Sequence, residues 1–126
     1  MISIAVNNGL GIMAVDIGNV FCMATCAENI CSCCVEEFGP RCDSIVVLNW
    51  DLYGLKMASN SFYRYFGDFL RDLVFTPSRA DQDLWIIKSE DYEGYDYIAT
   101  HVYDVIIEAN NPFKYMHDIK IKFKAR

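Results

Sequence analysis

The last third of the chain contains two apolar, β-rich runs that are separated by only two residues. Residues 95–102 and 105–108 are rich in isoleucine, valine and tyrosine, and Tyr103-Asp104 lies between them. Two such runs with so short a connection predict a tight β-hairpin. Because a tight hairpin projects its turn residues past the end of the sheet, we expect Asp104 to lie there.

The remaining segments predict further strands and two helices. We expect strands over residues 10–16, 28–35, 44–50 and 84–88.

From Asn60 to Val74, one side of a predicted helix carries Phe62, Phe66, Phe69, Leu70 and Leu73, and the other side carries Arg64, Asp68, Arg71 and Asp72. A terminal helix follows Asn110-Asn111-Pro112, and its apolar face should comprise Phe113, Met116, Ile119 and Phe123. This order predicts an α+β fold, an antiparallel sheet with helices packed on one face.

Length and charge limit the class of protein. The chain has 126 residues, 53% of them hydrophobic, which suffices for one domain with its own core. Its formal net charge of -6 argues against nucleic-acid binding by bulk electrostatic attraction. Charged and amide groups interrupt every long apolar stretch, and the N-terminal segment lacks a basic region. We therefore expect an intracellular protein, cytoplasmic or nuclear, with no signal peptide and no membrane contact.

The cysteine spacing does not match a structural zinc site. The six cysteines lack the paired C-x2-C arrangement of such sites, and inside the cell they should be reduced thiols. A cysteine-rich metal-binding protein stays open as a third alternative. The residues concerned are Cys22, Cys26, Cys31, Cys33, Cys34 and Cys42.

Two aspartates stand at the ends of predicted strands. Asp16 closes the first strand, and Asp104 lies in the late hairpin. A carboxylate at a strand end is most often a solvated cap. If one sheet edge brings the pair together, the two side chains could instead bind Mg²⁺, which prefers oxygen ligands and is often held by one or two carboxylates together with substrate phosphates.

Four segments, in order, resemble the motifs of copia-type retrotransposon reverse transcriptases, and together they extend over nearly the whole chain. Residues 14–21 resemble the first catalytic motif, in which an aspartate is followed five residues later by an aromatic side chain. Residues 52–56 match the Leu-Tyr-Gly-Leu-Lys signature, and residues 75–81 resemble a Gly-Phe-x-x-Ser-x-x-Asp stretch. Residues 98–107 occupy the place of the Tyr-Val-Asp-Asp hairpin.

The resemblance implies the palm domain of an RNA-directed DNA polymerase, a nucleotidyltransferase that uses two Mg²⁺ ions. Asp16 and Asp104 would be the catalytic, metal-binding acids. Phe21 would pack against the sugar of the incoming nucleotide, while Tyr53 and Gly54 would lie under the nascent base pair. The partners of such a domain are a nucleic acid template-primer and a deoxynucleoside triphosphate.

One departure from the family pattern affects the chemistry directly. Tyr103 stands where the family has the first aspartate of its hairpin, and a phenol is neutral near pH 7 and a poor Mg²⁺ ligand. Residues 1–126 match only the palm, so we expect a single partial domain without fingers, thumb or ribonuclease H. The sequence therefore predicts a polymerase remnant that is inactive by itself and binds Mg²⁺ and nucleic acid weakly or not at all. The alternative is a non-catalytic interaction module that reuses the palm fold.

Overall fold

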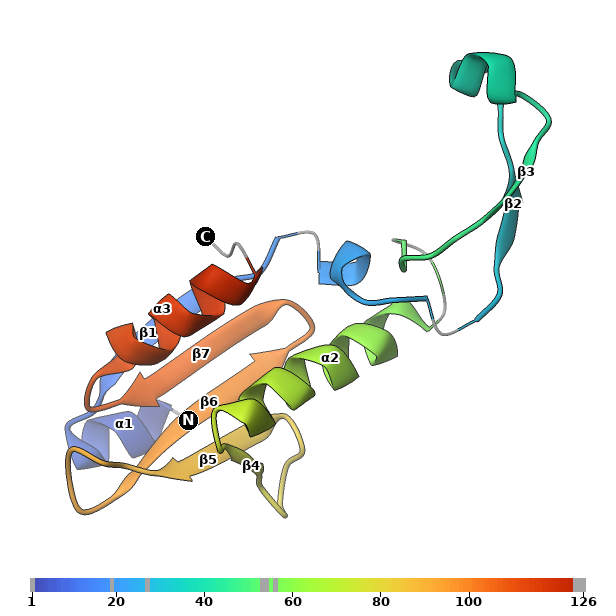
Figure 1. The fold of residues 1–126 in the computed structure, drawn as a ribbon. Helices are drawn as coiled ribbons and strands as arrows, with labels where there is room; N and C mark the ends of the chain where they lie inside the picture. Colours follow the sequence, from blue (N-terminus) through green and yellow to red (C-terminus); the bar gives the residue numbers. More distant parts are fainter. Residues whose placement is uncertain (1, 19, 27, 53–54, 56, 124–126) are drawn as a thin grey trace. The chain divides into compact units, whose positions relative to one another are not determined.

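A computed structural model describes residues 2–18, 20–26, 28–52, 55 and 57–123 (Figure 1). The chain divides into two compact units. Residues 1–20 and 66–126 form the first, which we call the sheet unit, and residues 21–65 form the second, which we call the hairpin unit. No helix in the described part of the chain is long and apolar enough to cross a membrane.

The sheet unit contains an antiparallel sheet of five strands. The order across the sheet is β1 (Gly11–Asp16), β7 (Asp104–Ala109), β6 (Tyr95–His101), β5 (Leu84–Lys88) and β4 (Thr76–Pro77). Every pair of neighbouring strands is antiparallel. The predicted α+β class with an antiparallel sheet is thus confirmed.

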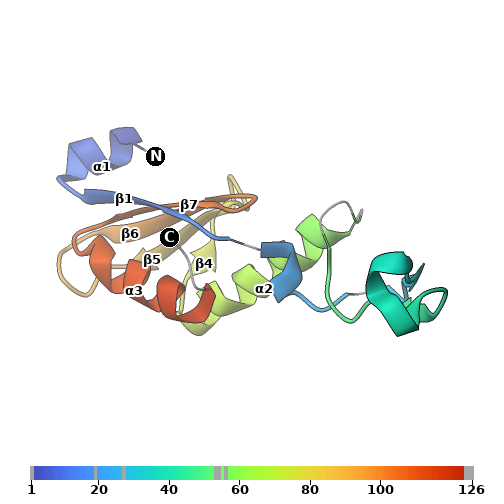
Figure 2. The same ribbon diagram turned by 90° about the horizontal axis from the view of Figure 1, so that it is seen from above.

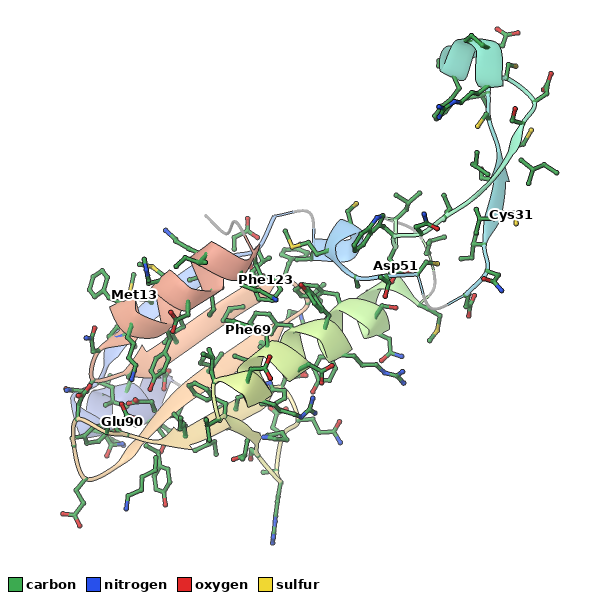
Figure 3. The ribbon with its side chains drawn as sticks, viewed as in Figure 1. Met13, Cys31, Asp51, Phe69, Glu90 and Phe123 are labelled. Atoms are coloured by element: carbon green, nitrogen blue, oxygen red, sulfur yellow. The ribbon has the colours of Figure 1, made fainter. Side chains whose placement is uncertain are left out.

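Helices cover both faces of this sheet. The helix α3 (Pro112–Phe123) and residues 66–72 of α2 (Ala58–Asp72) lie on one face, and α1 (Ile2–Asn8) lies on the other (Figure 2). Phe123 joins the two helices of the first face, since its ring centroid is 5.1 Å from those of both Phe66 and Phe69 (Figure 3). The expectation of helices on one face only is wrong, because the short apolar segment α1 forms a helix that was not predicted and packs against β1 and β7.

The core of the sheet unit follows from the two-residue period of its strands. Val15, Val105, Ile107 and Ile98 occupy the same face of three adjacent strands, and each exposes 2% or less of its surface. On β5, Trp85 lies opposite Ile98 and is likewise buried. Alternation along neighbouring strands therefore builds one continuous apolar layer beneath α2 and α3.

The hairpin unit contains a much smaller ladder. Its strands β2 (Cys31–Cys33) and β3 (Ile45–Val47) are antiparallel, and a 3-10 segment, η2 (Glu36–Arg41), lies between them in the chain. The strands are shorter than the predicted 28–35 and 44–50. Beyond them the pairing continues as separate contacts, including the hydrogen bond from the Leu48 N–H to the Ile30 carbonyl. A second 3-10 segment, η1 (Val20–Met23), begins at the boundary between the units.

The helix α2 confirms the predicted amphipathic helix with shifted ends. It begins at Ala58 rather than Asn60 and ends at Asp72 rather than Val74. Val74 has a φ of 67°, in the left-handed region, so the helix cannot continue through it. The predicted inner face is buried at Phe62, Phe66 and Leu70 and half-buried at Phe69 and Leu73.

The hairpin turn lies one residue earlier than predicted. Val102 and Tyr103 form the turn, and Val102 has a φ of 56°. Asp104 is paired with His101 and is the first residue of β7. The expectation that Asp104 projects beyond the sheet is therefore wrong, because this residue belongs to the ladder.

The helix α3 is rotated relative to the predicted face. Tyr115, Ile119 and Phe123 are buried, whereas Phe113 is 64% exposed and Met116 is half-buried. Tyr115 takes an inward position, where its hydroxyl bonds to Asp96 and its ring packs against Phe75. The Pro112 ring also packs so close to Gly11 that a Cβ placed there would be 3.1 Å from the ring.

Candidate functional site

The antiparallel pairing of β1 and β7 brings two aspartates together that are far apart in the sequence. Asp16 lies directly opposite Asp104, and both side chains are exposed. Because Val15 and Val105 next to them point into the core, the two aspartates share the opposite face of the sheet. We call Asp16 and Asp104 the acid pair. On the other side of Asp104 lies His101, so the three residues form a row across the ends of three strands.

Backbone contacts fix the position of the acid pair. The N–H of Ile17 donates to the carbonyl of Tyr103 at 3.0 Å, which continues the pairing of β1 one step past Asp16. Tyr103 itself occupies the turn next to Asp104 and is 45% exposed. Tyr103 therefore belongs to the turn directly before Asp104, and its backbone is bonded to the residue after Asp16.

Two adjacent carboxylates supply two negative charges, enough for one divalent cation with its remaining ligands from water or phosphate. In the described residues no group of three or more His, Cys, Asp or Glu side chains is placed to hold a metal ion. Carboxylate oxygens are hard donors of the kind that Mg²⁺ prefers. Two carboxylates are too few for a two-metal centre without a third acid or a bound phosphate.

The side chains of the predicted nucleotide-binding residues lie outside the described part of the chain. Tyr53 and Gly54 lie outside the described residues. Phe21 belongs to η1, but its side chain also lies outside the described part. Their roles stay predictions. The six cysteines are all free thiols; five of them are exposed or half-buried, and Cys34 is buried.

A buried carboxyl group on β7 was missed by the sequence analysis. Glu108 is completely buried, and neither of its carboxyl oxygens has a hydrogen-bond partner in the described structure. Burial raises the pKa of this carboxyl above its ordinary value of 4.5. Glu108 comes four residues after Asp104 on β7, and side chains an even number of residues apart point to the same face of a sheet. Glu108 therefore lies on the α1 side of the sheet. A lone acid inside the apolar run 105–109 was the signal that could have indicated it.

A second buried acid has a structural partner. Asp96 is 3% exposed and accepts hydrogen bonds from the Tyr115 hydroxyl at 2.8 Å and from the Asn110 backbone N–H at 3.4 Å. Burial, followed by the hydrogen bond to Asp96, raises the pKa of the Tyr115 hydroxyl well above its usual range. This arrangement anchors α3 to β6. No local sequence signal predicts it, since the partners come from different elements.

The hairpin unit also holds a buried acid. Asp51 is 1% exposed, and no described group bonds to its Oδ2 atom (Figure 3). Its backbone N–H donates to the carbonyl of Ala24 at 3.1 Å, next to an isolated bridge between Thr25 and Trp50. These contacts place Asp51 in the interior of its unit.

No protein-family model matches this chain, and no solved structure matches it. The family resemblance therefore depends on the four sequence motifs.

Proposed function

We propose that this chain is a degenerate palm fragment of a copia-type retrotransposon reverse transcriptase, in which the acid pair is the remnant of the metal site. The observation that carries the proposal is the register of β1 and β7, which places Asp16 opposite Asp104. In the family that the sequence resembles, the acids of the first motif and of the hairpin bind the metal ions. The acid pair joins these same two segments of the present chain.

The lost acid limits what this site can do. In two-metal nucleotidyl transfer, one ion activates the primer 3′-hydroxyl and the other neutralises the leaving pyrophosphate. Two divalent ions carry four positive charges, and the acid pair offers two negative ones. With Tyr103 in the turn, the acid pair binds one divalent ion weakly, and the isolated chain does not extend a primer.

Paramagnetic Mn²⁺ tests the metal position without depending on activity. In NMR spectra of the whole chain, substoichiometric Mn²⁺ should broaden the amide signals around residues 16 and 104 first. Asp16→Asn and Asp104→Asn should each abolish this selective broadening. Asp72→Asn is the matched control, since Asp72 is an exposed aspartate at the end of α2 and should leave the broadening unchanged. Broadening that ignores the acid pair, or persists in both variants, would contradict the proposal.

Primer extension tests the loss of activity separately. The whole chain, with Mg²⁺ or Mn²⁺, should incorporate no nucleotide on RNA or DNA templates. Template-dependent incorporation that disappears in Asp16→Asn would overturn the inactive assignment and establish a working polymerase site.

A specific observation favours a second function, a non-catalytic interaction module. Among the described residues of the hairpin unit, five large apolar side chains are more than half exposed: Val35, Phe38, Ile45, Val47 and Trp50. Exposed apolar patches of this kind are typical of protein interaction sites. If Mn²⁺ shows no preference for the acid pair, this second function becomes the better explanation of the fold.

A further inference from the structure

One edge of the sheet is incomplete, because β4 is much shorter than β5 beside it (Figure 1). Along β5, the backbone N–H and C=O groups point alternately toward β6 and toward the β4 side. Ser89, the residue after β5, donates its N–H to the carbonyl of Gly94 next to β6, so the odd-numbered residues bond on the β6 side. The residues whose backbone groups point outward are therefore Leu84, Ile86 and Lys88.

β4 and the residue after it occupy only the first two of these three outward positions. The third would lie opposite Val74, two residues before Thr76 in the same register. Val74 does not continue the strand, since its φ is 67° and its N–H donates to the carbonyl of Arg71 in the last turn of α2. Among the described residues, the outward N–H and C=O groups of Lys88 therefore have no strand partner. The two occupied pairs are Ser78 with Leu84, joined by a 2.7 Å hydrogen bond from the Ser78 N–H to the Leu84 carbonyl, and Thr76 with Ile86.

A pocket of about 510 Å³ lies at this open position. Its lining includes residues from both faces of the sheet. Lys88 and its cross-strand partner Tyr95 point to the α1 side, whereas Tyr115 and Asp118 belong to α3 on the other side. Because a pocket that touches both sets must extend past the edge of the sheet, it occupies the place of a missing strand.

We propose that an extended peptide segment of a partner protein binds here by adding a strand beside β5. In this mode of recognition, main-chain hydrogen bonds give affinity, and pockets for alternate side chains give specificity. The peptide residue opposite Lys88 donates its N–H to the Lys88 carbonyl and accepts a hydrogen bond from the Lys88 N–H. Its side chain lies beside Lys88 and Tyr95, and the side chains before and after it point to the α3 side. The proposal does not depend on the acid pair or on descent from a polymerase.

The α3 side of the pocket selects a basic side chain. Lys114 is paired with Glu90, with the ammonium nitrogen 3.0 Å from the carboxylate oxygen, so these two charges compensate each other. Asp118, one helical turn after Lys114, is half-buried and makes no ion pair within the described residues. A lysine or arginine next to the paired peptide residue therefore complements Asp118. The stem of that side chain packs against Tyr115, which its hydrogen bond to Asp96 holds in place.

Amide hydrogen exchange of the whole chain tests the open position. In the free protein, the N–H of Lys88 should exchange about tenfold faster than that of Ile87, which faces β6. The peptide acetyl-Lys-Val-Lys-amide at saturation should slow the exchange of Lys88 about tenfold and leave that of Ile87 unchanged. If the Lys88 N–H of the free protein is as protected as that of Ile87, the edge is already filled and the proposal is overturned.

Three further probes separate strand addition from simpler kinds of binding. NMR titration should give acetyl-Lys-Val-Lys-amide a Kd of about a millimolar, as expected for so short a peptide. The same peptide with N-methylvaline at its centre lacks the central N–H and should bind about tenfold more weakly, as should acetyl-Glu-Val-Glu-amide, whose charges are reversed. Acetyl-lysine-amide should show no measurable binding. No loss on N-methylation, or equal affinity for acetyl-lysine-amide, would mean that the pocket binds a side chain without adding a strand, and would overturn the proposal.

A charge variant assigns the contact with the basic side chain. Asp118→Asn should weaken binding of acetyl-Lys-Val-Lys-amide about fivefold and should not weaken that of acetyl-Glu-Val-Glu-amide. Asp83→Asn is the matched control, since Asp83 is an exposed aspartate just before β5 that does not line the pocket. A thermal melt verifies that both variants are folded. If Asp118→Asn binds the lysine peptide as tightly as Asp83→Asn does, the assigned contact with Asp118 is wrong.

Discussion

The sheet unit and the hairpin unit are built from similar apolar strand sequences and expose them to very different extents. In the sheet unit, Ile98 and Ile107 lie opposite each other on neighbouring strands and are completely buried. In the hairpin unit, all six residues of β2 and β3 are exposed, Cys31 among them (Figure 3). A two-stranded ladder by itself is marginal in water, whereas five strands with helices on both faces exclude water from an entire layer. Apolar composition alone therefore does not indicate whether a strand contributes to stability.

The same contrast occurs within a single strand. Asp104 and Glu108 both lie on the α1 side of β7, but Asp104 is exposed and Glu108 is fully buried. The difference is that α1 packs against one end of β1 and β7 only. One carboxyl group is thus free to meet a cation, while the other is kept away from water at a cost in stability.

The largest expected effect concerns the aromatic cluster of the sheet unit. Phe123→Ala removes a fully buried ring that contacts Phe66 and Phe69, and it should lower the free energy of unfolding by about 3–5 kcal/mol. Urea denaturation measures this loss. Phe113→Ala in the same helix is the matched control, because its ring is exposed, and it should cost less than about 0.5 kcal/mol. Equal losses for the two variants would mean that α3 faces the sheet with a different side.

The buried carboxyl group gives the next largest effect. Glu108→Met replaces a carboxyl that has no hydrogen-bond partner among the described residues by an apolar chain of similar length, and it should raise the free energy of unfolding at pH 7 by about 1–3 kcal/mol. Glu93→Gln, at an exposed glutamate, should change it by less than about 0.5 kcal/mol. A Glu108→Met variant less stable than the wild type at pH 7 would show that Glu108 has a partner there.

The pH dependence of this effect has a definite sign. The pKa of Glu108 is raised in the folded state, so the folded protein binds the proton more tightly than the unfolded chain. Stability from this group is fully present below the ordinary value of 4.5 and is lost as the pH rises through the raised pKa. The free energy of unfolding of Glu108→Met should therefore exceed that of the wild type by a growing amount as the pH rises above 4.5. Urea denaturation of both proteins between pH 4 and 8 measures it, and a constant difference would contradict the assignment.

The smallest effects are expected in the hairpin unit. Ile45→Ser and Val47→Ser change side chains of β3 that are mostly exposed, so each should alter the free energy of unfolding by less than about 0.5 kcal/mol. Ile107→Ser in the sheet unit should cost several times more, because that side chain is completely buried. Comparable losses at Ile45 and Ile107, measured by urea denaturation, would show that β3 is covered in solution and would favour the interaction-module alternative.

The sequence predicted the elements whose side chains repeat regularly over enough residues. The run 84–88 was predicted with its observed bounds, and α2 was identified by the spacing of Phe62, Phe66 and Leu70. α1 was missed because seven mostly apolar residues show no helical period, and β4 was missed because it consists of two residues and one is a proline. Contacts with neighbouring strands, rather than a local sequence pattern, accompany the formation of α1 and β4.

The candidate site was predicted in part. The motif resemblance gives Asp16 and Asp104 a shared metal-binding role, so we expected them near each other, and the register places them opposite each other. The turn itself was displaced by one residue, because both arrangements keep a two-residue connection and only the left-handed Val102 distinguishes them. The burial of Glu108 depends on α1, an element that the sequence did not reveal.

The most direct test of the acid pair as a metal position is a thermal melt of the wild type and Tyr103→Asp, each with and without Mn²⁺. Without metal, Tyr103→Asp should melt at a lower temperature, because it places a third negative charge beside Asp16 and Asp104. Mn²⁺ at ten times its Kd should stabilise the variant by about 1.4 kcal/mol, and at the same concentration it should stabilise the wild type less. Tyr103→Asn, which adds no charge, should behave like the wild type. Equal Mn²⁺-induced shifts in the wild type and Tyr103→Asp would mean that position 103 does not face a metal site, and they would contradict the palm assignment.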